Sequence, residues 1–114
     1  MTTEVKRRAG VRLLLALLAP LLAYASPAST QTVDIASGRK RAEVCMACHG
    51  ENGISVIPGI PNLAGQEREY LIKALLAYRG GQLRQDPTMF EMAKPLSDAD
   101  IANLAAFWNN LHAK

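Results

Sequence analysis

The chain has 114 residues, with 13 basic and 10 acidic side chains and a formal net charge of +3. The excess positive charge lies at the start, because residues 1–25 hold four basic residues and one acidic residue. Residues 26–114 therefore carry nine of each and are neutral. A neutral body excludes electrostatic nucleic-acid binding as the main function, and the length predicts one domain.

The N-terminus has the order of a secretory signal peptide. Four basic residues between Lys6 and Arg12 precede the apolar run Leu13–Ala25, which ends in the small-x-small cleavage site Ala23-Tyr24-Ala25. This run has 13 residues and contains Pro20, whereas a membrane-spanning helix needs about 20 apolar residues. We therefore expect residues 1–25 to be cleaved near Ala25, which leaves an exported chain with no stable membrane span.

Residues 26–32 are polar and lack apolar periodicity, so they are expected to form a flexible leader to a domain at 33–114. A first helix is predicted from about Val33 to Cys48. Its buried face would carry residues spaced three and four apart, namely Ile35, Gly38, Ala42, Cys45 and His49.

The end of this helix carries the run Cys45-Met46-Ala47-Cys48-His49, a Cys-x-x-Cys-His motif typical of c-type haem attachment. Side chains three and four positions apart share one face of a helical turn. Cys45 and Cys48 can thus form thioethers with two vinyl groups on one porphyrin edge, and His49 can ligate the iron. The motif predicts one haem c, covalently bound, and uses both cysteines of the chain.

Two other interpretations of this motif need features that the sequence lacks. A thioredoxin-like dithiol would require a βαβ pattern. A zinc site would require four ligands, and only Cys45, Cys48, His49 and the distant His112 are available.

Residues 50–65 are rich in glycine and proline and are predicted to form an apolar loop that lies against the haem. A second helix is expected at about 66–79, ended by Gly80-Gly81. Residues 82–95, which contain Pro87 and Pro95, are expected to be irregular. A third helix would begin at Ser97 with a capping box to Asp100. Its apolar face comprises Ile101, Leu104, Ala105, Trp108 and Leu111.

The candidates for the second axial ligand are Met89, Met92 and His112. His112 lies near the C-terminus, and Met46 lies on the wrong side of its own helix. Local chemistry barely separates Met89 from Met92. It slightly favours Met89, because Pro87 would hold the chain before it extended.

The segments CMACHG, IPNLAGQ and DPTMFEMAKPLSDADIANLAAFW resemble the small class I cytochromes c of bacteria. The resemblance spans about Gly38 to Leu111 and implies an all-α fold with three main helices and irregular loops around one covalently attached haem. It implies Met89, seven residues before Leu96, as the ligand, and Pro61 as the residue whose carbonyl accepts a hydrogen bond from the axial histidine. It also implies that Gly38 permits a close crossing by the last helix.

The expected function is therefore periplasmic transfer of one electron, on a His49/Met89-ligated haem, between redox protein partners such as a dehydrogenase, an oxidase or another cytochrome. The expected protein is a carrier and no enzyme in its own right. The alternative is a haem-based catalyst or gas sensor with a labile sixth ligand, which would need a polar or basic distal pocket. Tyr70, Tyr78 and Arg84 could bind the haem propionates, but equally could have core or solvent roles.

Overall fold

The computed structural model describes Pro20, Tyr24 and residues 32–112. Over these residues the chain forms four helices and no strands: α1 (Ile35–His49), α2 (Arg68–Gly80), α3 (Pro87–Ala93) and α4 (Asp98–Asn110). The expected all-α fold is thus confirmed. Apart from Pro20, Tyr24 and Thr32, the predicted signal peptide (1–25) and leader (26–32) lie outside the described residues. No helix of the described chain is long and apolar enough to span a membrane.

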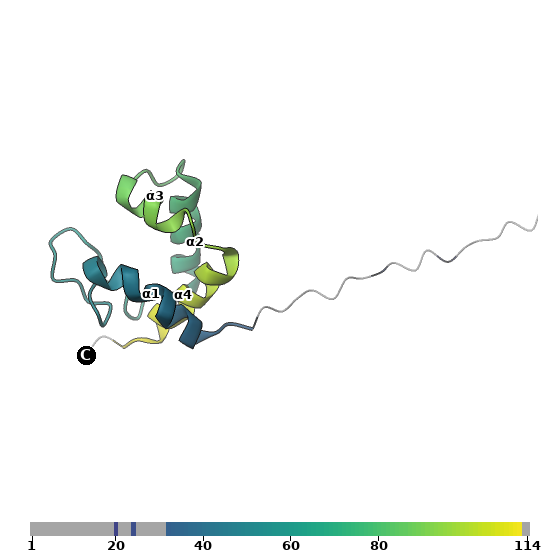
Figure 1. Cartoon of the computed structure of the whole chain (residues 1–114), viewed down its shortest axis with the longest axis horizontal. Coiled ribbons are helices and arrows are strands. Elements are labelled where there is room, and N and C mark those ends of the chain that lie inside the picture. The colour runs from purple at the N-terminus through teal and green to yellow at the C-terminus, as the bar shows by residue number, and fades with distance from the viewer. Residues whose placement is uncertain (1–19, 21–23, 25–31, 113–114) are drawn as a thin grey trace, which may run out of the picture.

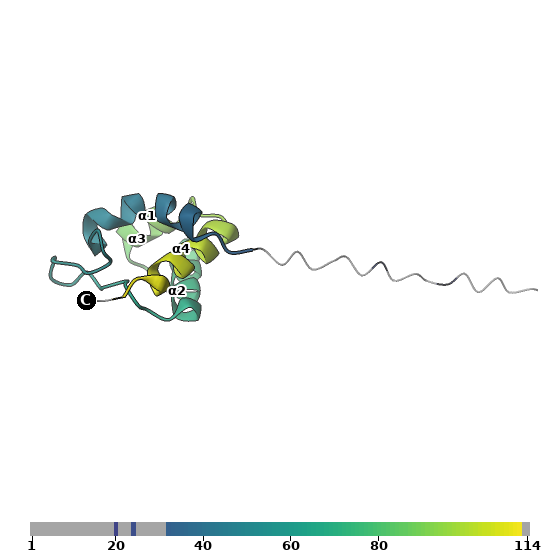
Figure 2. The same ribbon diagram turned by 90° about the horizontal axis from the view of Figure 1, so that it is seen from below.

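Helices α1 and α4 form the base of the fold, where they cross (Figures 1 and 2). The crossing is close at Gly38, since a Cβ there would stand 2.2 Å from the backbone oxygen of Asn103 and 3.0 Å from the Cβ of Phe107. The implied role of Gly38 in helix packing is therefore confirmed. One turn further along α1, Ala42 is fully buried. Ile35, which was expected on the same face, is 43% exposed, because it precedes the crossing.

Capping side chains fix where α1 and α4 begin. Asp34 accepts a hydrogen bond from the backbone N of Ser37 at 3.1 Å and another from its hydroxyl at 2.7 Å. Ser97 and Asp100 exchange hydrogen bonds of 3.0 and 2.9 Å, which confirms the predicted capping box. Hydrogen bonds with Ser97 lower the pKa of Asp100, because they stabilise its ionised carboxylate.

Helix α2 packs against both α4 and α3. Its C-cap, Gly81, has a φ of 71°, and a Cβ there would stand 2.9 Å from the Phe90 ring on α3. Arg79 donates to the Leu96 carbonyl at 3.0 Å and pairs with Asp98 at 2.7 Å, which ties the end of α2 to the start of α4. The buried core joins α2, α3 and α4 to α1 and comprises Ala42, Leu71, Ala93, Leu96, Ile101, Leu104, Ala105, Phe107 and Trp108.

Helix α3 corrects one expectation, because residues 82–95 were predicted to be irregular. Pro87 occupies the first turn of a helix, where its missing N–H costs nothing and its fixed φ suits the helical backbone. Asp86 is the N-cap and accepts from the backbone N of Met89 at 2.8 Å. The argument that Pro87 keeps the chain extended before Met89 is therefore wrong, and Met89 and Met92 both lie on a helix.

Candidate functional site

The last turn of α1 brings Cys45, Cys48 and His49 together. Neither cysteine is paired in a disulfide; Cys45 is half-buried against the core and Cys48 is exposed. Burial raises the pKa of the Cys45 thiol, because the surrounding protein disfavours the thiolate. Met46, between them, packs on the core, as expected for a residue pointing away from the site.

His49 has a defined tautomer. The residue is 7% exposed, and Nδ1 lies 2.7 Å from the carbonyl oxygen of Pro61. A carbonyl oxygen only accepts, so Nδ1 must carry the proton and donate. In the neutral imidazole, the other nitrogen, Nε2, then has its lone pair free. It has no hydrogen-bond partner among the described residues, yet is not sealed from solvent. A neutral imidazole with this nitrogen free is a ready iron ligand.

The loop at 50–65 holds the Pro61 carbonyl in position. The Ser55 hydroxyl donates to the Cys48 carbonyl at 3.0 Å, and the Ser55 backbone N donates to Asn62 Oδ1 at 2.7 Å. Gly53, with a φ of 74°, accepts from Leu63 and Ala64 at 2.8 and 3.0 Å. Sequence inspection did not single out Ser55 or Asn62, since their roles depend on contacts seven residues apart.

Met89 lies on α3, away from His49. Helix α1 packs on α4 but not on α2 or α3 within the described residues, and Figure 1 shows α3 standing apart from α1. Met89 is half-buried, whereas Met92 is 46% exposed. The third candidate, His112, is exposed beyond the end of α4. The two halves of the fold that could supply axial ligands are therefore separate in space.

These residues fit haem c. The site has two thiols three residues apart on the last turn of α1, an imidazole whose Nδ1 is hydrogen-bonded to Pro61, and a thioether on α3. Large apolar side chains stay exposed on the intervening loop, among them Ile54, Val56 and Ile57 at 38, 92 and 43%. In the described part of the chain no three His, Cys, Asp or Glu side chains form a metal-binding group.

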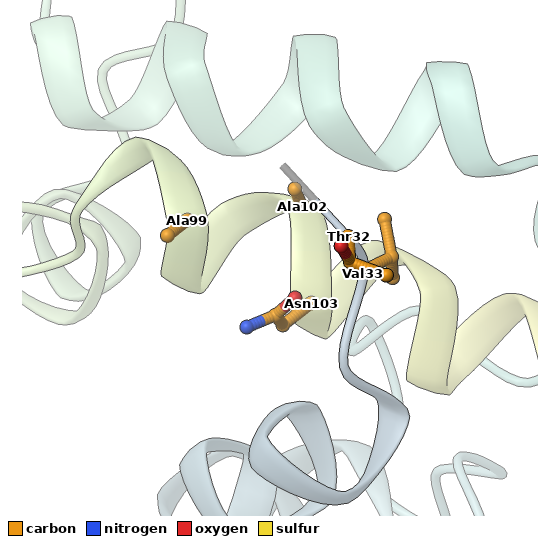
Figure 3. A pocket seen from close by; sticks show the side chains of 5 residues that line it. All are labelled: Thr32, Val33, Ala99, Ala102 and Asn103. Carbon is orange, nitrogen blue, oxygen red and sulfur yellow. The ribbon is translucent and has the colours of Figure 1, made fainter. Parts of the chain in front are cut away.

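A hollow beside α4 carries no such chemistry. It has a volume of about 210 Å³ and lies between α4 and the segment that precedes α1 (Figure 3). It is lined by Thr32, Val33, Ala99, Ala102 and Asn103. None of these side chains is titratable or a usual metal ligand. The residues that could bind a cofactor therefore lie at the end of α1 and not in this hollow.

The sequence matches the Cytochrome c family over residues 35–112. It is 42% identical over 79 residues to cytochrome c-554(548) of Halomonas halodenitrificans, covering 68% of this chain and 95% of that protein. It is 37% identical over 91 residues to the thiosulfate dehydrogenase electron acceptor of Thiomonas intermedia, covering 79% of this chain and 39% of that protein.

Among solved structures, the fold is similar to that of reduced recombinant cytochrome c4 from Pseudomonas stutzeri. The TM-score is 0.67 and the sequence identity 35%, over 71% of this chain and 47% of the other. The chain thus spans nearly all of one relative and less than half of two larger ones. It therefore belongs to the cytochrome c family, as a monohaem electron carrier that holds haem c through Cys45, Cys48 and His49.

Proposed function

We propose that the chain is exported to the periplasm, loses residues 1–25, and carries one electron at a time on a haem ligated by His49 and Met89. The observation that carries this proposal is the 2.7 Å hydrogen bond between His49 Nδ1 and the Pro61 carbonyl. It leaves the lone pair of Nε2 free to bind iron. The haem supplies an iron that cycles between its ferric and ferrous states.

Methionine as the sixth ligand suits a carrier. A neutral thioether favours ferrous iron and raises the reduction potential, and two protein ligands leave no site for substrate. Of the methionines on α3, Met89 has its backbone N fixed by Asp86 at 2.8 Å and is the less exposed. The resemblance to class I cytochromes c points to the same residue.

The partners we propose are redox proteins, either an oxidoreductase or another cytochrome. One relative is named as the electron acceptor of thiosulfate dehydrogenase, which supports a partner of this kind. The exposed edge beside Cys48 is bordered by the apolar loop, and residues 52–66 contain no charged side chain. On the other side, Arg41 pairs with Asp100 at 3.8 Å, which weakens the basic cluster Arg39–Arg41 as a docking patch. We therefore propose that docking is largely apolar.

The ligand assignment is tested by replacing each methionine of α3. In the ferric protein, iron–sulfur coordination produces a long-wavelength absorption band. We expect Met89→Ala to abolish this band and Met92→Ala, the matched control on the same helix, to retain it. Loss of the band only in the Met92 variant would show that Met92, and not Met89, is the ligand. Rapid, tight binding of carbon monoxide by ferrous wild-type protein would instead indicate a labile sixth site and contradict the carrier function.

A further inference from the structure

Ser55 connects the two backbone segments that meet in the hydrogen bond between His49 and Pro61. Its hydroxyl donates to the Cys48 carbonyl at 3.0 Å, and that carbonyl belongs to the peptide unit that leads into His49. Its backbone N donates to Asn62 Oδ1 at 2.7 Å, and the backbone N of Asn62 shares a peptide plane with the Pro61 carbonyl. One residue thus links both sides of the contact that orients the imidazole.

The turn after α1 brings Ser55 back to the end of the helix. Gly50 has a φ of 89°, and a Cβ there would overlap the Ile54 carbonyl, so the chain folds closely onto itself at this point. The Ser55 hydroxyl accepts from the backbone N of Ile57 at 3.1 Å. It has one proton to donate, and the Cys48 carbonyl is the nearer acceptor, at 3.0 Å against 3.3 Å for the Ile57 carbonyl. The position of the hydroxyl is therefore defined by contacts on both of its sides.

The need to satisfy a helix end does not by itself account for this link. The Cys48 carbonyl is one of the last four of α1, which have no partner within the helix, and no backbone N–H of residues 32–112 donates to it. The contact with Ser55 is exposed to solvent, so a water molecule could satisfy this carbonyl as well. A water molecule could not, however, join the carbonyl to Asn62 and through it to Pro61.

We propose, on the basis of the haem ligation proposed above, that Ser55 is a positioning residue that keeps the hydrogen bond from His49 to Pro61 short and thereby lowers the reduction potential. The bond is 2.7 Å long, and hydrogen bonds weaken steeply as they become longer or misaligned. Donation from Nδ1 to a carbonyl oxygen raises the basicity of the ligating nitrogen. A more basic ligand favours ferric iron, which carries one more positive charge than ferrous iron.

The test combines the midpoint potential of the holoprotein with ¹⁵N NMR of the His49 Nδ1–H group in the diamagnetic ferrous state. Without the hydroxyl, the loop can shift relative to α1. We expect Ser55→Ala to raise the potential and to accelerate solvent exchange of the Nδ1 proton about tenfold, because the hydrogen bond to Pro61 opens more often. Ser55→Thr keeps the hydroxyl and should keep both values close to those of the wild type.

The matched control is Ser37→Ala. The Ser37 hydroxyl donates to Asp34 at 2.7 Å, at the opposite end of α1. Its removal should cost a hydrogen bond of the same helix while leaving the potential and the exchange rate unchanged. Both readouts depend on the His49 imidazole and not on stability in general, so they separate a positioning role from a purely structural one.

A second variant cuts the link at its other end. Asn62→Ala removes the acceptor of the Ser55 backbone N–H and should raise the potential and the exchange rate as Ser55→Ala does. Since the two variants break one link, the potential of the double variant should change by less than the sum of the single changes. Asn62→Ala also decides the question if Ser55→Ala does not fold.

Ser55→Ala and Asn62→Ala values that coincide with those of Ser37→Ala would overturn the proposal, even if both variants were less stable. A potential that falls in the two variants would overturn it as well. If the iron–sulfur band still depends on Met89 in either case, the His49/Met89 ligation stands and only the role of Ser55 fails. A band that no longer depends on Met89 would instead contradict the ligation itself.

Discussion

Gly38 shows how a single missing side chain shapes the site. The backbone of α4 occupies the space that a Cβ would need, with the Asn103 oxygen only 2.2 Å from that position. The obstruction is backbone on a buried helix, so no side-chain rotation can relieve it. Any larger residue must push α1 and α4 apart.

We expect Gly38→Ala to destabilise the holoprotein by about 1–3 kcal/mol, as overpacking of a tight contact does. Equilibrium denaturation would measure this change. Gly80→Ala is the matched control, because Gly80 is also helical but has no neighbouring atom within 4 Å of the added Cβ. That variant should be neutral or gain up to about 1 kcal/mol from helix propensity. Equal losses in both variants would contradict a steric role for Gly38.

The residues that would bind the haem were more predictable from the sequence than the contacts that hold them in position. Cys45, Cys48 and His49 are neighbours in the chain, so their spacing alone predicts a shared helical face. The residues that hold the Pro61 carbonyl are a different case. Ser55 and Asn62 act through the loop's specific turns, and no short-range pattern encodes such contacts. Arg84 likewise donates hydrogen bonds to the hydroxyls of Tyr78 and Tyr70, which lie 6 and 14 positions away in the sequence.

At the scale of elements, the contrast between α4 and α3 is instructive. Helix α4 has a capping box and an apolar stripe over three turns, so local signals and packing agree. Helix α3 has seven residues, beginning with Pro87, and Pro95 follows it closely. It is too short for a periodic apolar stripe. Its signature is the pair Asp86-Pro87, an N-cap followed by proline in the first turn. Read as a helix start rather than as a loop, that pair would have predicted α3.

The Asp86 carboxylate caps α3 at the backbone N of Met89. Without this carboxylate, Met89 should dissociate from the iron at a lower temperature than that at which the helices unfold. We expect Asp86→Ala to cost about 1 kcal/mol. The iron–sulfur band should then be lost on heating at a lower temperature than helical circular dichroism. Glu91→Ala removes the same charge from the exposed side of α3 and should leave the two transitions together. Coincident transitions in the Asp86 variant would show that the cap does not govern ligand release.

At the scale of the whole molecule, the four helices form two units joined through α4. Among the helices of the described residues, α1 packs only on α4, while α2 packs on both α3 and α4. A chain this short buries only about 60% of its unfolded surface, which leaves little stability in reserve. A group lying between the units would give cover to the exposed side chains of Ile54, Val56 and Ile57. The haem would therefore complete the core as well as carry the electron.

The haem-free variant Cys45→Ala/Cys48→Ala should accordingly be largely unfolded, since binding and folding are coupled in such small domains. Thermal scans by circular dichroism should show no cooperative transition. Met89→Ala, which keeps the covalently attached haem, is the control and should still unfold cooperatively. A sharp transition in the double-cysteine variant would mean that the polypeptide core is sufficient by itself.

The close crossing at Gly38 also means that a small change in the angle between α1 and α4 moves the far end of α1. His49 lies 11 residues beyond the crossing, about 16 Å along the helix axis, so a change of about 5° in the crossing angle would displace the imidazole by roughly 1.4 Å. The hydrogen bond to Pro61 restrains His49 at the end of α1, and α1 would pivot at the contact between Gly38 and Asn103. Precision at the iron is therefore set partly by a backbone contact more than three helical turns away. Substitutions near Asn103 should therefore change the position of the His49 imidazole as well as the stability of the fold.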